Sequence, residues 1–312
     1  MPYDYDIAII GAGAAGYSAA IYAGRSGASV IICDKGMGGG LTSEADVIEN
    51  YPGFKKIKGP ELMEKMKEHA SQYADMHFLE EVKEIEPFED GIKIKTSKRE
   101  YKVGAVILCT GTEHKKLGVK GEKEFRGRGV SYCATCDGPF FIGKKVAVVG
   151  GGNTAISEAI YLKDIGCDVT VIHRRDELRA EKILEDEAEE KGVKFIWNSI
   201  VDEIFGDNTV KGIKIKNVKN GDIKKIDIDG IFISIGEEPQ NQLAKQIGIE
   251  LDKKGYIKVD RMQRTSVKRI YAAGDITNGI RQIVIACSEG AIAALASLEV
   301  IGKRNPFGDK IQ

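Results

Sequence analysis

The chain contains one sequence pattern twice, and this repeat constrains the fold more than any other feature. Each copy is a short apolar run, a glycine cluster, a stretch rich in small residues and a second apolar run, over residues 6–34 and again over residues 145–173. A shift of 139 positions superimposes the two copies. The coinciding residues are Gly11 with Gly150, Gly13 with Gly152, Gly16 with Ala155, Ser18 with Ser157, Ala20 with Ala159, Ile21 with Ile160, Tyr22 with Tyr161 and Gly27 with Gly166. Strand, glycine turn, helix and strand in succession predict an α/β fold with two similar halves.

The glycine cluster of the first copy has the spacing of a dinucleotide-binding turn. Gly11, Gly13 and Gly16 follow an apolar run and open a small-residue helix, so backbone N–H groups there can approach a pyrophosphate. Asp34 ends the next apolar run, where a carboxylate can accept hydrogen bonds from ribose hydroxyls. The pattern therefore predicts a Rossmann-like unit for a dinucleotide with a free adenosine ribose, such as FAD or NAD.

The second copy differs at the position that contacts the ribose. His173 replaces Asp34, and Arg174, Arg175 and Arg179 follow it. Guanidinium groups bind a phosphate through two parallel hydrogen bonds, so this copy favours NADPH. The alternative is an exposed helix start, in which Glu177, Glu181 and Glu185 pair with the arginines.

Two cysteines separated by two residues, Cys133 and Cys136, lie just before the second copy, and Asp137 follows them. Such a pair can alternate between dithiol and disulfide, and its setting can lower the pKa of one thiol. The sequence offers no second cysteine pair and no nearby histidines, so a zinc site is disfavoured and we expect no metal. The other four of the six cysteines lie in apolar stretches, as buried thiols of a reducing cytoplasm do.

Composition limits the remaining possibilities. At 312 residues the chain favours two domains, and a net charge of −1 argues against a nucleic-acid-binding protein. The sequence enters a strand pattern directly after Met1, so we expect no leader. The apolar run 283–301 is long enough to cross a membrane. Ser288, Glu289 and Gly290 near its middle favour a buried helix instead, and we expect no membrane span.

Other segments have simpler patterns. Residues 59–73 predict an amphipathic helix and residues 81–101 a layer of short strands. Residues 105–109 predict a buried strand and residues 179–190 an exposed helix. Asn220-Gly221 predicts a hairpin within 194–235, and residues 237–241 a linker.

Together these motifs resemble the low-molecular-weight thioredoxin reductases over nearly the whole chain. The resemblance rests on motifs in one order: Gly11–Gly16, Glu49–Gly53, Cys133–Asp137, Gly150–Ala155, His173–Arg175 with Arg179, Gly274-Asp275 and Arg281-Gln282. It implies two Rossmann-like domains of three-layer β/β/α type, the second inserted into the first. Residues 1–113 and 242–312 would bind FAD, and residues 114–241 would bind NADPH and carry the cysteine pair. It also implies a cytoplasmic homodimer whose partner is thioredoxin or a thioredoxin-like protein.

The resemblance assigns cofactor contacts to residues of this chain. The expected FAD contacts are Gly11, Gly13, Ala14, Ala15, Gly16, Asp34, Lys35, Gly39, Gly40, Leu41, Thr42, Asn50, Val82, Thr110, Gly111, Gly274, Asp275, Arg281, Gln282 and Ile283. The expected NADPH contacts are Gly150, Gly152, Asn153, Thr154, His173, Arg174, Arg175, Arg179, Ile235 and Gly236.

The family's reaction implies the catalytic roles. Electrons pass from NADPH to the flavin and then to the Cys133–Cys136 disulfide. Cys136 would meet the flavin, Cys133 would attack the disulfide of thioredoxin, and Asp137 would handle the proton. The same pair must meet a buried ring and then a bulky protein, so we expect hinges near residues 114–117 and 238–241.

Two departures and several alternatives accompany this hypothesis. Gly40 stands where many members carry Gln, so that either one flavin contact is weaker or backbone replaces the missing amide, and Gln240 stands where Asn is common. A related flavoprotein could serve a peroxiredoxin or glutaredoxin-like partner, or use a donor other than NADPH. The alternatives of another class are a redox sensor without turnover and a flavin oxidase with structural cysteines.

Overall fold

The structure is a computed structural model, described here for residues 3–45 and 47–304. The expectation of no leader rests partly on Met1 and Pro2, which lie outside the described residues, as does the end of the expected range 242–312. The chain divides into two compact units: residues 1–113 with 238–312 form the first unit, and residues 114–237 form the second unit.

The second boundary differs from the expected one. It falls after Glu237 rather than after residue 241, because the segment beyond Glu237 is bonded to the first unit. The Gln240 N–H donates to the Gly111 carbonyl at 3.0 Å, and the Thr110 hydroxyl donates to the Gln240 carbonyl at 2.8 Å.

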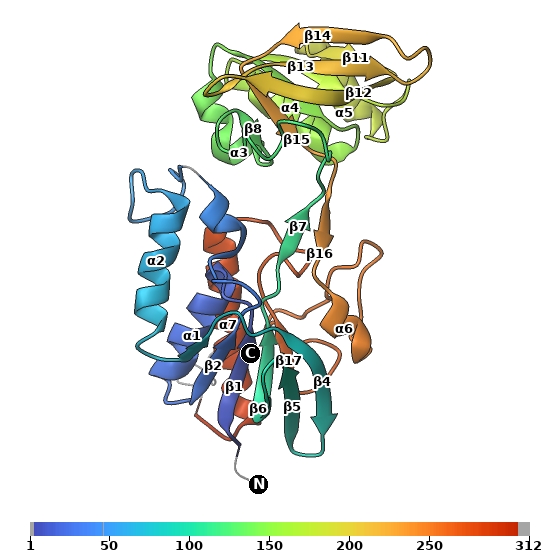
Figure 1. Cartoon of the computed structure of the whole chain (residues 1–312). Coiled ribbons are helices and arrows are strands. Elements are labelled where there is room, and N and C mark those ends of the chain that lie inside the picture. Colours follow the sequence, from blue (N-terminus) through green and yellow to red (C-terminus); the bar gives the residue numbers. More distant parts are fainter. Residues whose placement is uncertain (1–2, 46, 305–312) are drawn as a thin grey trace. The chain divides into compact units, whose positions relative to one another are not determined.

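A seven-stranded sheet organises the first unit (Figure 1). Its order is β3-β2-β1-β6-β5-β4, with β17 also paired to β6. Strands β1, β2, β3, β6 and β17 run parallel, whereas β4, β5 and β6 form an antiparallel meander. The bounds are β1 Tyr5–Ile10, β2 Val30–Cys33, β3 Asp75–His77, β4 Val82–Phe88, β5 Gly91–Thr96, β6 Glu100–Leu108 and β17 Ile270–Ala272.

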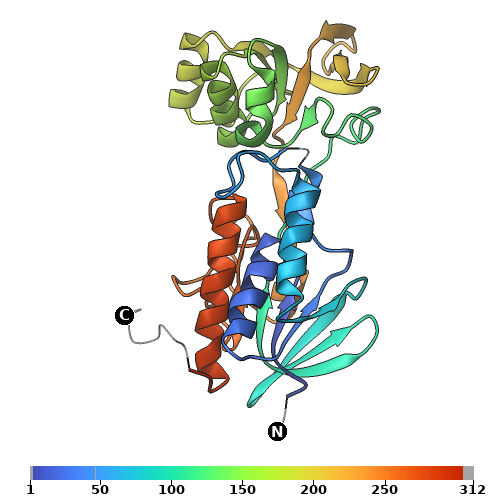
Figure 2. The same ribbon diagram turned by 90° about the vertical axis from the view of Figure 1, so that its left-hand side faces the viewer.

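Both faces of this sheet are covered, as the continuous apolar strands require. Along β1, Ile7 and Ile9 pack into the core beneath the helices, while Ala8 and Ile10 pack into the core on the meander side. Helices α1 (Ala14–Arg25), α2 (Gly59–Ala70) and α7 (Ile283–Val300) lie side by side in the first unit, as Figure 2 shows. The unit also contains η1 (Gly40–Glu44) and α6 (Gln242–Gln246).

The second unit repeats this architecture around a five-stranded sheet of order β11-β10-β9-β15-β8. Val146 and Val148 of β9 face the helical core, whereas Ala147 and Val149 face a separate three-stranded sheet, β12-β13-β14. The bounds are β8 Val130–Ser131, α3 Ala134–Asp137, η2 Gly138–Phe141, β9 Lys145–Val149, α4 Asn153–Asp164, β10 Asp168–Ile172, α5 Lys182–Glu190, β11 Lys194–Ile196, β12 Ser199–Gly206, β13 Val210–Asn217, β14 Ile223–Asp227 and β15 Gly230–Ile233.

Two short strands, β7 (Thr112–His114) and β16 (Glu237–Pro239), carry the chain between the units and pair with each other. The expected linker at 237–241 is therefore partly a strand, and α6 follows it. The Lys115 N–H donates to the Gly236 carbonyl at 3.0 Å, so the two ends of the second unit lie next to each other.

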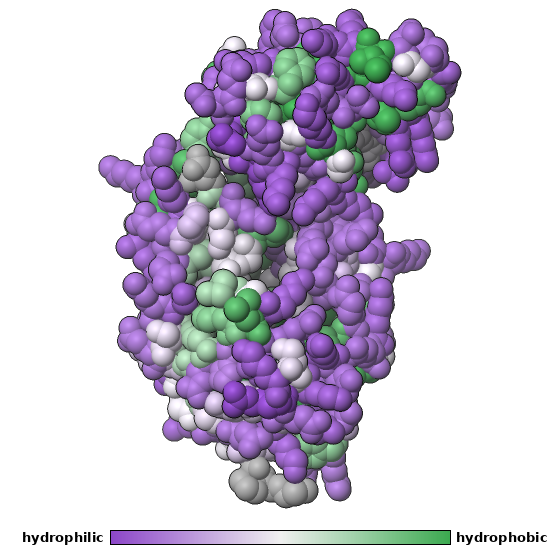
Figure 3. Space-filling view, in the orientation of Figure 1, coloured by the Kyte–Doolittle hydropathy of each residue, from purple (hydrophilic) through white to green (hydrophobic). Residues whose placement is uncertain are grey.

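The predicted α/β class is confirmed, and so are the two strand, glycine turn, helix and strand units. Most predicted elements are found within a few residues: the helix expected over 59–73 ends at Ala70, and the one expected over 179–190 begins at Lys182. The predicted hairpin is β13–β14, in whose turn Gly221 has a φ of 80°. The face in Figure 3 is mostly hydrophilic, in line with a chain of 30% charged residues.

Among the described residues, one helix, α7, is long and apolar enough by length and composition to cross a membrane. This helix packs directly against α1, because Gly290 lies so close to Ala15 that a Cβ there would be 2.1 Å from the Ala15 carbonyl oxygen. It buries six residues within the first unit. These contacts place part of α7 in the core of the first unit.

Candidate active site

A disulfide joins Cys133 and Cys136, whose Cα atoms are 5.3 Å apart. Cys133 precedes the single turn of α3, and its N–H donates to the Ser131 hydroxyl at 3.1 Å. The Asp137 N–H donates to the Cys133 carbonyl at 3.1 Å and closes this turn. The sequence predicts the cysteine pair and its acid but not the helical turn that presents them.

The redox turn is fixed on α4. Ala134 is fully buried in the core of the second unit. Gly138 lies against the same helix: a Cβ there would be 2.9 Å from Leu162 Cδ2 and 3.1 Å from Ile165 Cδ1. The turn between and after the two cysteines is thus packed against α4, and the cysteines themselves are half-buried.

In the first unit, several of the expected flavin contacts lie where the parallel strands end. Gly11 has a φ of 106°, and a Cβ there would be 2.3 Å from the Cys109 carbonyl oxygen at the end of β6. Gly274 follows β17, where a Cβ would be 2.9 Å from Ala15 Cβ. At Gly13, by contrast, an added Cβ would meet no atom within 4 Å, so this glycine faces open space. An open cradle of this kind fits a pyrophosphate.

Asp34 holds the loops of this region together. Its carboxylate accepts hydrogen bonds from the N–H groups of Ala12 and Gly36, both at 2.7 Å. The Gly39 N–H donates to the Ala12 carbonyl at 2.6 Å, so residues 34–42 fold back onto the glycine turn. Gly40 lies within this contact, because a Cβ there would be 3.5 Å from the Gly13 Cα.

The N-terminus of α7 reaches the same region. Gln282 is its N-cap residue, and its side-chain oxygen accepts from the Asn50 amide at 3.0 Å. The Arg281 side chain lies against Tyr256, with its guanidinium 5.4 Å from the centre of the ring. Lys35 is exposed and forms an ion pair with Glu113 at 3.0 Å.

Glu289 is a contact that the sequence analysis missed. Its carboxylate accepts from the Gly274 N–H at 2.7 Å and from the Thr277 hydroxyl at 3.3 Å, and so supports the Gly274-Asp275 turn. Burial raises the pKa of Glu289, although these two donors oppose the rise. A carboxylate near the middle of a largely apolar helix was the available signal.

The second glycine turn has a similar open side. An added Cβ at Gly152 would meet no atom within 4 Å. The Asn153 side chain bonds Glu181 twice, and thereby ties the start of α4 to the start of α5. A Cβ on Gly150 would be 2.5 Å from the Ser234 carbonyl oxygen, so the segment that carries Ile235 and Gly236 lies beside the turn.

His173 lies beneath this turn and is only 5% exposed. Its Nδ1 is 3.0 Å from the Gly150 carbonyl oxygen, and its Nε2 has no hydrogen-bond partner among the described residues. Burial is the main cause that lowers the pKa of His173, and Arg179 and Arg175 lower it further, so the neutral ring is favoured.

The three arginines are exposed. Within the described ranges, none of Arg174, Arg175 and Arg179 has a carboxylate at ion-pair distance. Glu181 is engaged by Asn153, and Glu185 pairs with Lys182 at 3.1 Å. The arrangement favours an anion site over the alternative of arginines neutralised along a helix.

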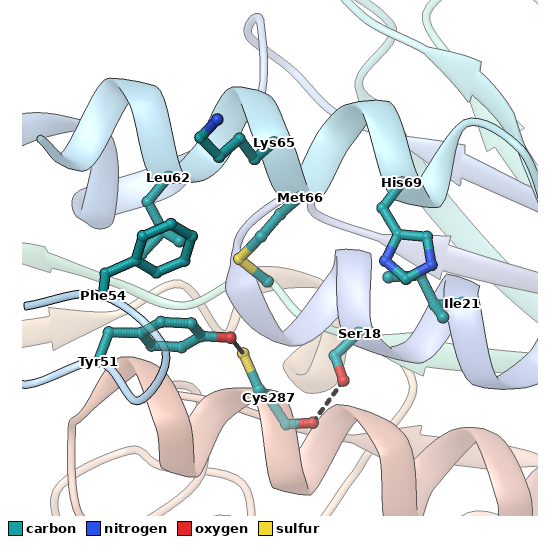
Figure 4. Close-up of a pocket in the computed structure, with 9 residues that line it drawn as sticks. All are labelled: Ser18, Ile21, Tyr51, Phe54, Leu62, Lys65, Met66, His69 and Cys287. Atoms are coloured by element: carbon teal, nitrogen blue, oxygen red, sulfur yellow. Dashed lines mark hydrogen bonds between the residues drawn. The ribbon is translucent and has the colours of Figure 1, made fainter. Parts of the chain in front are cut away.

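A cavity of about 250 Å³ lies in the first unit between α1, α2, α7 and the loop after Tyr51 (Figure 4). Tyr51 and Cys287 point toward each other, with the hydroxyl 3.9 Å from Sγ. None of the expected cofactor contacts lines this cavity. In the part of the chain that the structure describes, no cluster of His, Cys, Asp or Glu could hold a metal ion.

Comparisons with known proteins define the class. The family model for pyridine nucleotide-disulphide oxidoreductases matches residues 5–290, and the chain belongs to this family. It is therefore an oxidoreductase whose chemistry joins a flavin and a nicotinamide cofactor to a disulfide.

Its similar relatives carry a more particular name. A thioredoxin reductase of Bacillus subtilis is 43% identical over 93% of this chain and 92% of its own. The thioredoxin reductase of Treponema pallidum is 42% identical, over 96% of this chain and 98% of its own. The crystal structure of the Streptococcus pyogenes thioredoxin reductase covers 96% of this chain and 99% of its own, with 42% identity and a TM-score of 0.91.

Proposed function

We propose that this protein is a thioredoxin-disulfide reductase that uses NADPH and FAD. The observation that carries the proposal is the Cys133–Cys136 disulfide, set on a turn in the same unit as a dinucleotide-type glycine loop. The full-length similarity to thioredoxin reductases supports thioredoxin, or a thioredoxin-like protein, as the substrate.

FAD would bind the first unit. The open side of Gly13 gives room for the pyrophosphate, and Asp34 would take the adenosine ribose. Each Asp34 oxygen already accepts one backbone N–H and keeps capacity for a hydroxyl donor. Gln282, Ile283 and the Gly274-Asp275 turn would hold the flavin end.

NADPH would bind the second unit at Gly152, Asn153 and Thr154. Exposed Arg174, Arg175 and Arg179 offer positive charge to the 2′-phosphate. The buried His173, whose Nδ1 lies 3.0 Å from the Gly150 carbonyl oxygen, would support the glycine turn from the inside of the unit.

The cysteine pair would perform the exchange with thioredoxin. With NADPH and FAD bound, the Cys133–Cys136 disulfide would accept an electron pair and two protons and become two thiols. The Cys133 thiolate attacks a thioredoxin sulfur and forms a mixed disulfide. Cys136 then attacks the Cys133 sulfur, which restores the disulfide and releases thioredoxin as a dithiol. Asp137 would be the proton donor and acceptor in these steps.

We further propose a cytoplasmic homodimer. The free cysteines in the described ranges, Cys33, Cys109, Cys167 and Cys287, are unpaired, as in a reducing compartment. Large apolar side chains on the helical face of the first unit are exposed, including Tyr22 of α1 at 44% and Val284 of α7 at 42%, and a second subunit would cover them.

The decisive experiment follows electrons to thioredoxin. The purified protein should be yellow and should oxidise NADPH only when thioredoxin disulfide is present. Cys133→Ser and Cys136→Ser should each abolish this turnover while flavin stays bound, and Cys287→Ser is the matched control with normal turnover. Turnover that persists in Cys136→Ser would point to a flavin oxidase. If NADPH were oxidised only with another disulfide protein, that protein and not thioredoxin would be the substrate.

A further inference from the structure

A group of side chains in the second unit connects the segment after β7 to the residue before Cys133. We call Glu122, Tyr132, His114, Glu237 and Arg126 the Tyr132 cluster. All five belong to the second unit, and none of them is among the expected cofactor or catalytic contacts.

Tyr132 is the centre of the cluster. Its ring stacks on the His114 imidazole, with the ring centres 4.7 Å apart and the planes 17° from parallel. The Arg126 guanidinium lies 5.1 Å from the centre of the same ring. The Tyr132 hydroxyl donates to Glu122 Oε1 at 2.7 Å. The position of Tyr132 is therefore fixed through both its ring and its hydroxyl.

Glu122 extends these contacts to the chain that enters the second unit. It is 5% exposed, and its carboxylate also accepts from the N–H groups of Leu117 at 2.9 Å and Gly118 at 2.7 Å. One buried carboxylate thus bonds both Tyr132 and the end of the 114–117 segment. A hydrogen bond to a buried charged acceptor is among the stronger ones in proteins.

His114 extends the contacts to both connecting strands. It ends β7, and its Nδ1 is 3.4 Å from Oε1 of Glu237, which begins β16. Both side chains are largely buried, at 16% and 17% exposure. His114 and Glu237 lie where the chain enters and leaves the second unit. His114 therefore contacts Tyr132 directly, and Glu237 contacts it through His114.

We propose that Tyr132 is a positioning residue that couples the redox state of the Cys133–Cys136 pair to the connecting strands. This inference rests on the proposed function. Cleavage of the disulfide releases Cys133 from Cys136, and Tyr132 is the adjacent residue in the chain. Movement of Cys133 therefore changes the Tyr132 contacts with His114 and Glu122, and these hold the connecting segments.

Coupling of this kind acts in both directions. If the disulfide and dithiol forms stabilise different arrangements of residues 114–118, then the arrangement of those residues alters in turn how Cys133 is presented. Through such coupling, the oxidation state of the cysteines would determine how they are exposed to a partner. Tyr132 would need no contact with a cofactor for this.

Limited proteolysis of the flavin-containing full-length protein tests this coupling. Lys115 and Lys116 are exposed in the connecting segment, so trypsin cleavage there reports how firmly the cluster holds it. Cleavage is timed by mass spectrometry for the disulfide form and for protein reduced with dithiothreitol and desalted under argon. We expect the two rates to differ about tenfold, the effect of one hydrogen bond of about 1.4 kcal/mol.

Variants show whether Tyr132 carries the effect. Tyr132→Leu should bring the two cleavage rates together, because it removes the stacking and the hydrogen bond. Tyr132→Phe keeps the ring, should lose most of the difference, and decides the question if the leucine variant does not fold. His69→Ala is the matched control, since His69 contacts Tyr73 in the first unit at 5.8 Å between ring centres. It should keep the wild-type difference.

Turnover gives an independent measurement. In Tyr132→Leu, thioredoxin-dependent NADPH oxidation should fall about tenfold, by the same energy of one hydrogen bond. Reduction of ferricyanide, which takes electrons from the flavin without the cysteines, should stay at the wild-type rate. Equal cleavage rates for the two wild-type forms, or a difference that persists in Tyr132→Leu, would overturn the inference. Failure of the wild type to reduce thioredoxin would instead overturn the proposed function, because the proteolysis needs neither thioredoxin nor nucleotide.

Discussion

The carboxylate of Asp34 accepts a hydrogen bond at 2.7 Å from the backbone N–H of Ala12, within the first glycine turn. The residue expected to bind a ribose therefore also sets the shape of the loop expected to bind the pyrophosphate. Both halves of the proposed FAD site depend on this one side chain.

Asp34→Ala should weaken FAD binding by more than a lost ribose contact, because Ala12 and Gly36 lose their acceptor as well. Hydrogen bonds to charged groups contribute roughly 1.5–3 kcal/mol each, so the Kd should rise at least about tenfold. Flavin fluorescence on dilution of the holoprotein measures the Kd. Asp75→Ala, an exposed acid on β3, is the control and should retain FAD. An unchanged Kd in Asp34→Ala would place the ribose elsewhere.

Arg174→Ala combined with Arg175→Ala should raise the KM for NADPH about tenfold or more, since a charged hydrogen bond to the phosphate contributes roughly 1.5–3 kcal/mol. The KM for NADH, which has no 2′-phosphate, should change little. Steady-state kinetics with both nucleotides measures the effect. Lys224→Ala removes an exposed cation from β14 and should alter neither KM. Equal changes for both nucleotides would contradict the phosphate assignment.

Gly290→Ala should destabilise the first unit, because the added methyl would lie 2.1 Å from the Ala15 carbonyl oxygen of α1. Overpacking of this kind typically costs about 1–3 kcal/mol. Thermal unfolding of the apoprotein should show a lower Tm. Gly152→Ala is the matched control: no atom lies within 4 Å of the new methyl, so the Tm should stay near wild type while nucleotide binding weakens. A stable Gly290→Ala protein would show that α1 and α7 can separate at no cost.

Glu289 should make stability depend on pH in an unusual direction. Because burial raises the pKa of this carboxyl in the folded state, folding takes up a proton. Its contribution to stability is fully present below the unfolded pKa of about 4.3 and is lost as the pH rises through the folded value. Glu289→Gln, which keeps an acceptor oxygen, should therefore be most destabilising relative to wild type at low pH. If the Tm difference between Glu289→Gln and the wild type were the same at pH 4.5 and pH 8, the predicted pH dependence would be wrong.

Cysteine reactivity should separate the redox pair from the other thiols. Burial raises the pKa of Cys33 to about 12 and also raises the pKa values of Cys109, Cys167 and Cys287. In reduced native protein at pH 8, iodoacetamide should modify Cys133 or Cys136 first, because the thiolate is the nucleophile. Peptide mass spectrometry over time measures the order. Rapid modification of Cys33 would mean that the end of β2 opens in solution.

The sequence predicts the local units well and the connections between them less well. The apolar strand Asp6–Ile10 and its glycine turn were predictable because both faces of a parallel strand are buried and the turn needs residues that tolerate positive φ. The strand β16 was not, because Glu237–Pro239 has no apolar alternation and owes its form to pairing with β7. The short α3 depends likewise on packing against α4, which no local pattern records.

For the candidate site, the sequence motifs named the residues that carry chemistry but not those that support them. Glu289 accepts from the backbone N–H of Gly274, 15 residues away, and Glu122 joins the nearby N–H groups of Leu117 and Gly118 to the Tyr132 hydroxyl, 10 residues away. Such contacts depend on the tertiary fold. The burial of His173 beneath the second turn was equally hidden, because its sequence position alone suggested a side chain directed at the cofactor.

The adjacent ends of the second unit have a consequence for how such chains can change. The Lys115 N–H and the Gly236 carbonyl are hydrogen-bonded, so residues 114–237 form a closed loop of chain. Because its two ends are adjacent, this segment can be exchanged between homologous proteins as one piece. Only two junctions are needed, and the path of the remaining chain does not change. Replacement of this one segment would then transfer the preference for NADPH or NADH to another protein, and the first unit would keep its sequence.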